Sequence, residues 1–263
     1  LVKAIESKRR FTLSKLISAT HEITSSSRIN SNSQRILMYH SVVNQNYLKD
    51  KFTIGEDLFY SQIRVAKEIY GKDIDNLENT QKTDNFSCKK LNITFDDGYK
   101  DNLKIVFPIM EKLQLPFSIF VATDYLKKEY TNFLNAEDLK ELSSFPDVSI
   151  GSHAKSHTDL TQLNKKEIEN ELKDSKSIIE DIIGKEVKMF SYPHGGVNKE
   201  IRDLVENSGY KIAANSRFDT NKQIKDLHML NRIEIWNSDS IKIFKQKLTG
   251  HWDWMRYRQK LIE

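Results

Sequence analysis

Short apolar runs rich in β-branched and aromatic residues recur along the chain, and stretches with helical spacing separate them. The runs predict strands at 36–40, 91–95, 117–122, 148–151, 187–192, 210–214 and 229–235. The intervening patterns predict helices at about 57–70, 100–113, 136–144, 164–183, 198–207 and 238–248. This alternation is typical of parallel strands with helical crossovers. Seven strands that alternate with helices favour a sheet that closes into a barrel rather than an open sheet. We therefore expect an α/β fold, a barrel of about seven parallel strands with outer helices.

The segment 164–183 gives the clearest helix signal. Asn164 is a favourable N-cap residue, and Glu167 three positions later completes the pattern of a capping box. Apolar residues recur on one face, and Gly184 is a typical stop signal. In contrast, residues 71–90 are polar and lack periodicity, so we expect a long loop or an exposed insertion near the functional face.

The composition indicates a globular protein rather than a disordered chain, with 38% hydrophobic and 30% charged residues among 263. The net charge of +4 arises from 41 basic and 37 acidic residues without a long basic block, so a nucleic-acid partner is not expected. Cys88 is the single cysteine, which excludes an intramolecular disulfide and a cysteine-based zinc site.

A Ser/Asn-rich tract at 25–33 separates the N-terminal part from the rest. We expect residues 1–34 to form a helical segment and linker, and residues 35–263 to form the folded, functional domain. The first segment suits a helix docked on this domain, and peripheral membrane contact is the alternative. No apolar run is long enough for a membrane span. No signal-peptide pattern is visible, which favours the cytoplasm unless a signal peptide of a secreted or cell-surface protein has been removed.

Residues suited to chemistry gather where the predicted strands end. Asp96 and Asp97 follow the second predicted strand, and His153 and His157 follow the fourth. Further candidates at strand ends are His40, Tyr192, Pro193 and His194. Because the carboxyl ends of parallel strands meet at one rim of a barrel, these side chains are expected to converge there.

Two imidazoles and one carboxylate are a common ligand set for a catalytic divalent cation. One aspartate of the pair then suffices as a ligand, and the other can accept a proton from water that the cation acidifies. Gly98 allows the backbone to turn so that both carboxylates reach the mouth. Each motif alone has a plain explanation, since Asp-Asp-Gly is usually a turn and two histidines four apart are more often incidental. Their joint occurrence at strand ends favours the metal site.

Three motifs occur in an order that resembles the polysaccharide deacetylase family of carbohydrate esterases: TFDDGY at 94–99, GSHAKSHTDL at 151–160 and FSYPHGG at 190–196. The opening strand ILMYHSV, 36–42, is similar to that of exopolysaccharide and poly-N-acetylglucosamine deacetylases. The resemblance covers roughly residues 35–250. It implies a deformed barrel with fewer than eight strands, in agreement with the seven predicted strands.

The resemblance also implies roles for individual residues. Asp96 would be the catalytic base, while Asp97, His153 and His157 would bind the metal, usually zinc and sometimes cobalt or nickel. The backbone N–H of His194 would help to stabilise the oxyanion that forms when water attacks an acetamide.

The chain departs from the family pattern near the site. Ala154 stands where many members have Ser or Thr, and Ser191 stands where many have an arginine that tunes the base. The Leu-x-His motif that supplies a general acid is absent, although the leaving amine needs a proton. His40 is therefore the first candidate for the acid and His228 the second. A hydrogen-bonded structural role is the alternative for both.

Arg232 and Glu234 alternate with isoleucines along the last predicted strand, so both are expected to face the barrel interior. Arg232 would bind a carboxylate or orient Asp96, and a simple ion pair within the protein is the alternative. Aromatic loop residues would stack on sugar rings or else pack in the core. The candidates for substrate binding are Tyr99, Tyr192, Pro193, Arg232 and Trp236.

Together these observations predict a metal-dependent hydrolase that removes N-acetyl groups from amino sugars of a bacterial polysaccharide. The alternatives are a deformylase or O-deacetylase acting on a lipid-linked or surface sugar, and a non-catalytic carbohydrate-binding protein of the same fold. Retention of Asp96 argues against the non-catalytic alternative, because a metal site alone would not need the second carboxylate.

Overall fold

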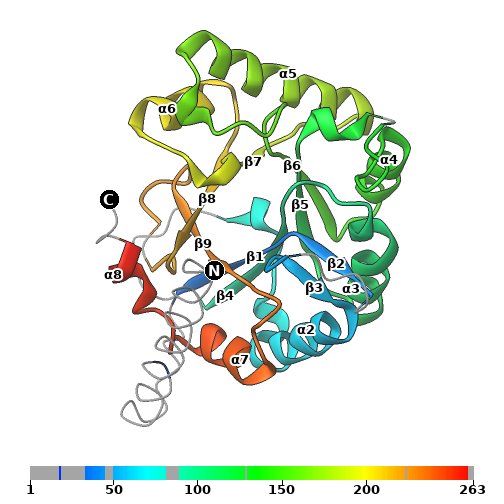
Figure 1. Ribbon diagram of the computed structural model, residues 1–263, viewed down its shortest axis with the longest axis vertical. Coiled ribbons are helices and arrows are strands. Elements are labelled where there is room, and N and C mark those ends of the chain that lie inside the picture. Colours follow the sequence, from blue (N-terminus) through cyan, green and yellow to red (C-terminus); the bar gives the residue numbers. More distant parts are fainter. Residues whose placement is uncertain are drawn as a thin grey trace, which may run out of the picture.

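The computed structural model describes residues 18, 33–44, 50–80, 89–127, 129–222 and 224–259. Their centre is a closed barrel of parallel strands, with β9 paired to β1 to complete the ring (Figure 1). In barrel order the strands are β1 (Gln34–Tyr39), β4 (Lys90–Phe95), β5 (Phe117–Val121), β6 (Val148–Ser152), β7 (Met189–Ser191), β8 (Ile212–Phe218) and β9 (Leu230–Glu234). All seven predicted strands are present in the described residues. The prediction of a deformed (β/α) barrel is confirmed.

Helices surround the barrel on its outer face (Figure 1). They are α2 (Glu56–Tyr70), α3 (Phe107–Leu113), α4 (Ala136–Ser143), α5 (Lys165–Ile183), α6 (Lys199–Asn207), α7 (Ile241–Thr249) and α8 (Met255–Gln259). As predicted, α5 begins with a capping box between Asn164 and Glu167 and ends at Gly184 in the left-handed conformation. The features that were not predicted include helix α8, a π-helical turn (Asn102–Val106) before α3, and a small parallel sheet of β2 (Ser41–Val43) and β3 (Thr53–Gly55).

The register of the parallel strands brings the candidate residues to one rim. Tyr39 and Phe95, the last residues of β1 and β4, are partners, so His40 and Asp96 leave the barrel side by side. The Asp96 N–H donates to the Tyr39 carbonyl at 2.9 Å. The His153 N–H donates in the same way to the last residue of β5, at 2.8 Å. The loops after β1, β4 and β6 therefore share the carboxyl end of the barrel.

Buried apolar side chains form two groups. The larger group lies between the strands and the helices and includes Tyr39, Phe95 and Phe117. The smaller group plugs the barrel near its amino end and consists of Ile36, Leu77, Phe120, Met189, Ile212, Ala214, Ile224 and Leu230. This plug leaves the carboxyl end of the barrel interior to polar side chains.

Residues 71–80 contradict the expectation of an insertion near the functional face. Ile74 forms a bridge with Leu91 at the start of β4, and the Asp75 N–H donates to the Leu91 carbonyl at 3.0 Å. Leu77 is fully buried in the plug. This part of the segment therefore closes the amino end of the barrel, opposite the aspartate pair. Ile74 and Leu77 alone are too few to produce a periodic hydrophobic pattern in the sequence. Residues 81–88 lie outside the described part.

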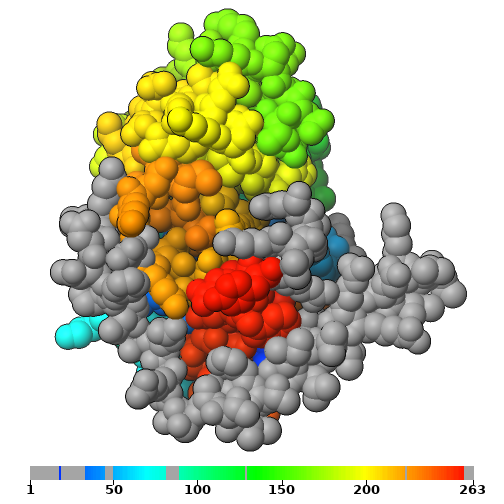
Figure 2. Space-filling model, turned by 90° about the vertical axis from the view of Figure 1, so that its left-hand side faces the viewer, coloured from blue at the N-terminus to red at the C-terminus, as the bar shows by residue number. Residues whose placement is uncertain are grey.

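In the C-terminal segment, α7 packs against α2 and α8 packs against β8, and the red C-terminal residues lie below the yellow and orange ones in Figure 2. Trp252 is fully buried, and Asp253 accepts two hydrogen bonds from the buried Arg35 guanidinium, at 2.7 and 2.9 Å. The predicted N-terminal helix, with its proposed membrane contact, lies outside the described residues apart from Ser18. Within the described ranges, no helix has both the length and the apolar character that crossing a membrane requires.

Candidate active site

Asp96 and Asp97 lie directly after β4 and line a cavity at the carboxyl rim. Asp97 and Gly98 have positive φ angles, 73° and 75°, so the chain turns sharply at this point. A Cβ at position 98 would lie 3.2 Å from the Val121 side chain. Glycine is therefore favoured here by both conformation and space.

His153 and His157 lie in the loop after β6, as predicted. Ala154 and His157 have φ angles of 60° and 61°, so unfavourable backbone conformations are concentrated around this site. His153 Nδ1 lies 2.7 Å from the Ser191 carbonyl oxygen. The proton therefore belongs on Nδ1, and the lone pair of Nε2 is available to a ligand.

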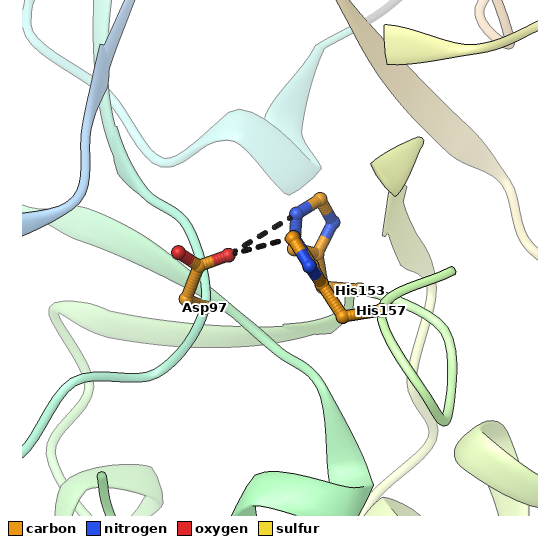
Figure 3. A group of neighbouring side chains, drawn as sticks. All are labelled: Asp97, His153 and His157. Carbon is orange, nitrogen blue, oxygen red and sulfur yellow. Dashed lines mark ion pairs between the residues drawn. The ribbon is translucent and has the colours of Figure 1, made fainter. Parts of the chain in front are cut away.

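Asp97, His153 and His157 face one another across a small gap (Figure 3). Asp97 Oδ1 lies 3.5 Å from His153 Nε2 and 3.1 Å from His157 Nε2. One ligand atom from each residue lies within 4.8 Å of the others. Apart from these two imidazole nitrogens, the buried Asp97 Oδ1 has no polar partner among the described residues. Two imidazoles and one such carboxylate oxygen fit a divalent cation such as zinc.

Asp96 is held by Arg232, which reaches it from β9. The guanidinium donates to both carboxylate oxygens at 2.7 Å and to Ser191 Oγ at 2.8 Å. Its remaining N–H groups donate to Thr94 Oγ1 at 3.3 Å and to the Asn215 carbonyl at 2.9 Å. All five donors of the fully buried Arg232 thus have acceptors. Of the roles considered for Arg232, this geometry matches the orientation of Asp96.

The electrostatics of the site follow from burial and these contacts. Burial opposes ionisation of Asp96, but the Arg232 guanidinium and the His153 ring hold the pKa of this carboxyl well below its usual range. Burial also opposes ionisation of Asp97, whose pKa is nevertheless lowered by His157 and His153. Burial lowers the pKa of His153 to about 4. For His157, burial is outweighed by the contact with Asp97, and the pKa is raised.

The cavity at this rim has a volume of about 310 Å³. Its lining includes three other candidates, His40, Tyr99 and His194. The His40 ring packs on Phe52 with 4.7 Å between ring centroids, and its buried Nδ1 has no hydrogen-bond partner among the described residues. The His194 ring lies 4.6 Å from that of His157.

Other candidates do not line this cavity in the described structure: Tyr192, Pro193, Arg232, Trp236 and His228. Tyr192 is fully buried, and its hydroxyl donates to the His228 carbonyl at 2.9 Å. Trp236 Nε1 donates to the Glu234 carboxylate. His228 lies at the amino end of the barrel, with Nε2 2.9 Å from the carbonyl oxygen of Tyr210, just before β8. It therefore has the structural role that was its alternative.

No sequence pattern pointed to Asp50, Phe52, Thr53 or Ser216, which also line the cavity. Asp50 and Phe52 lie just before β3, and Asp50 Oδ1 accepts from the Phe52 N–H at 2.8 Å. They reach the site because β2 and β3 form an additional sheet at the mouth. Their composition is that of an ordinary turn.

Comparison with known proteins decides the family. Residues 83–213 match the family model described as polysaccharide deacetylase. These residues form a polysaccharide deacetylase domain. A Bacillus subtilis protein named as a polysaccharide deacetylase is 25% identical over 201 residues, covering 76% of this chain and 70% of the relative. A poly-β-1,6-N-acetyl-D-glucosamine N-deacetylase of Staphylococcus aureus is 24% identical over 205 residues, covering 68% and 71% respectively.

Solved structures of proteins titled as deacetylases share the fold of this chain. The Streptococcus pyogenes deacetylase PplD in complex with acetate matches with a TM-score of 0.70 at 22% identity, covering 82% of this chain and 98% of that one. IcaB from Ammonifex degensii matches with a TM-score of 0.66 at 16% identity, covering 84% and 97%. At these identities the comparison supports the barrel architecture alone.

The arginine that contacts Asp96 lies on a different strand from the one that the resemblance implied. The resemblance placed such an arginine at the position of Ser191, on β7. Here Arg232 comes from β9, and Ser191 accepts one of its hydrogen bonds. Arg232 and Asp96 are separated by 136 residues, so no local motif could reveal their contact.

Proposed function

We propose that this polysaccharide deacetylase is a metal-dependent hydrolase that removes N-acetyl groups from amino sugars of a bacterial polysaccharide. The cluster of Asp97, His153 and His157, with Asp96 in the same cavity, is the observation that carries the proposal. The family and the named relatives support a carbohydrate substrate. The poly-N-acetylglucosamine relative supports an N-acetylated amino sugar within it.

A divalent cation held by Asp97, His153 and His157, zinc first and cobalt or nickel as alternatives, would supply Lewis-acid polarisation of the acetamide carbonyl and acidify water. Asp96 accepts the proton of the attacking water as general base. A carboxylate offers about four lone-pair positions. Arg232 and Ser191 use three of those on Asp96, which leaves one to accept a proton.

Arg232 orients Asp96 for its role as the base before the reaction begins. Its donors fix the plane of the Asp96 carboxylate before substrate arrives, so no free energy is spent on orienting the base during the reaction. The low pKa of Asp96 keeps it ionised at neutral pH. Arg232 contributes to both effects without lining the cavity itself.

Two histidines complete the proposed reaction. The His194 backbone N–H stabilises the negative charge that develops on the carbonyl oxygen. His40 protonates the leaving amine, since it lines the cavity and its ring is held against Phe52.

The test is acetate release from N-acetylglucosamine oligomers by protein stripped of metal and then supplied with zinc, cobalt or nickel. We expect release to require restored metal and to fall at least about 1,000-fold in Asp96→Asn and His153→Ala, because each removes a group needed in the transition state. Release of formate from N-formylated sugars, or of acetate from O-acetyl esters alone, would instead support the alternative substrates. Stoichiometric metal without hydrolysis of any of these would favour the non-catalytic alternative.

A further inference from the structure

Four aromatic side chains form a continuous surface beside the cavity. Tyr99, Tyr125, Tyr130 and Phe133, here called the aromatic platform, come from the turn after β4 and from the connection between β5 and α4. The rings of Tyr99 and Phe133 are stacked at 4.7 Å, with 23° between their planes. Tyr125 lies 4.3 Å from Phe133 and 5.5 Å from Tyr130.

The platform begins at the proposed metal site. The Tyr125 ring lies 5.8 Å from the ring of His157, and Tyr99 lines the 310 Å³ cavity. Tyr99 and Phe133 also line a second cavity of about 630 Å³, which shares Ser41 and Tyr99 with the first. The two cavities therefore adjoin, and the platform extends from the reacting group along the surface.

Core packing does not account for the platform. Tyr130 is 42% exposed, and the other three rings are half-buried. The neighbouring Leu134 is 1% exposed and supplies the core contact of this segment. Aromatic surface that stays exposed beside a cavity is typical of a ligand site.

The platform is also held in place before any ligand binds. The Lys100 N–H donates to the Asn132 carbonyl at 2.8 Å, and the Leu134 N–H donates to the Gly98 carbonyl at 2.9 Å. These bonds attach the segment to the turn that carries Asp97. A surface ordered in advance loses little conformational entropy on binding.

We propose that the aromatic platform is a second sugar subsite, which binds another sugar of the same polysaccharide whose acetamide enters the cavity. The inference rests on the proposed function. The apolar C–H faces of a sugar ring suit an aromatic surface. The exposed Thr131 and Asn132, between Tyr130 and Phe133, offer hydrogen bonds to its hydroxyl groups. This subsite would make the enzyme prefer oligomers to the monosaccharide.

The test compares N-acetylglucosamine, its dimer and its hexamer, in β-1,4 and β-1,6 linkage, using Tyr130→Ala and Tyr130→Phe in the full chain. Tyr257→Ala is the matched control, since Tyr257 is 61% exposed on α8, across the barrel from β5 and α4 (Figure 1). We expect kcat/KM on the preferred hexamer to fall about tenfold in Tyr130→Ala, mainly through KM. The monosaccharide should change less than about twofold, and Tyr130→Phe and Tyr257→Ala should resemble the wild type.

Calorimetric titration with the same hexamers separates this inference from the proposed function. If the wild type releases no acetate but binds the hexamer about tenfold more tightly than Tyr130→Ala does, the subsite stands while the proposed reaction fails. Equal losses on monosaccharide and hexamer would mean that Tyr130 acts on the reacting group and would overturn the subsite. Binding of the hexamer no tighter than the monosaccharide, or unaffected by Tyr130→Ala, would overturn it as well.

Discussion

Arg232 and Asp96 are both almost inaccessible to water, with side chains 0% and 3% exposed. Burying two charges is costly, and their attraction compensates only when the remaining donors and acceptors are also satisfied. Here the guanidinium has five acceptors, so the pair is tolerated. Removal of the arginine would leave an uncompensated buried carboxylate, and its orientation toward the cavity would no longer be determined.

We therefore expect Arg232→Gln to lower the free energy of unfolding by about 3–5 kcal/mol and to lower kcat/KM at least about 100-fold. Arg35→Gln is the control, because Arg35 is equally buried and forms the same two-point pair with Asp253. It should cost similar stability and leave kcat/KM nearly unchanged below the unfolding transition. Urea unfolding and acetate release measure the two effects. Equal losses of activity would mean that Arg232 contributes only stability.

At this scale, sequence motifs found the residues that meet at strand ends, and the structure brings Asp96, Asp97, His153 and His157 together. Motifs could not show which way a side chain leaves a strand end. Tyr192 follows β7 within a motif, yet it turns into the core because its ring has a buried partner surface in Phe190, at 5.3 Å. Long-range pairing is equally invisible in a local pattern.

At the scale of elements, the π-helical turn after the aspartate pair holds the β1–β2 connection. Asp101 Oδ2 accepts from the Ser41 hydroxyl at 2.6 Å, and Oδ1 accepts from the Val42 N–H at 3.0 Å. Asn102 donates to the His40 carbonyl at 3.1 Å. π-helical turns are often found at functional sites. This one fixes the backbone of the proposed acid, His40.

Burial of Asp101 raises its pKa to about 6, even though the Ser41 and Val42 donors oppose the shift. Because the folded pKa exceeds the usual 3.8, the associated stability is fully present below about pH 3.8 and is lost as the pH rises through about 6. Asp101→Asn can keep the geometry, since its amide can accept from Val42 and donate to Ser41 Oγ. It removes the titrating group.

We expect the wild type to lose about 3 kcal/mol of unfolding free energy relative to Asp101→Asn between about pH 4 and pH 8. Urea unfolding of both proteins across this pH range measures the difference in their unfolding free energies. The other titrating groups are present in both proteins, so their contributions to this difference cancel. A difference that stays constant, or that grows in favour of the wild type as the pH rises, would contradict the raised pKa of Asp101.

At the scale of the whole molecule, alternation of strands and helices was enough to predict the barrel. It could not predict how the ring is closed. β1 has six paired residues with β4 but only two with β9. The C-terminal segment bridges the β1–β9 seam, because Arg35 of β1 donates to Asp253 and to the Lys247 carbonyl at 3.1 Å, while Lys247 Nζ donates to the Glu234 carbonyl of β9 at 2.8 Å.

This bridge predicts that Asp253→Ala lowers the free energy of unfolding by about 3–5 kcal/mol, since it leaves the Arg35 charge buried beside the seam. Asp219→Ala is the control, because its pair with Arg256 at 3.4 Å is partly exposed and should contribute less than about 1 kcal/mol. Replacing both partners, Arg35→Met with Asp253→Leu, removes the unpaired charge and should recover most of the loss. Urea unfolding of these variants measures the coupling. If Asp253→Ala lowered the free energy of unfolding no more than Asp219→Ala does, the C-terminal segment would not stabilise the junction between β1 and β9.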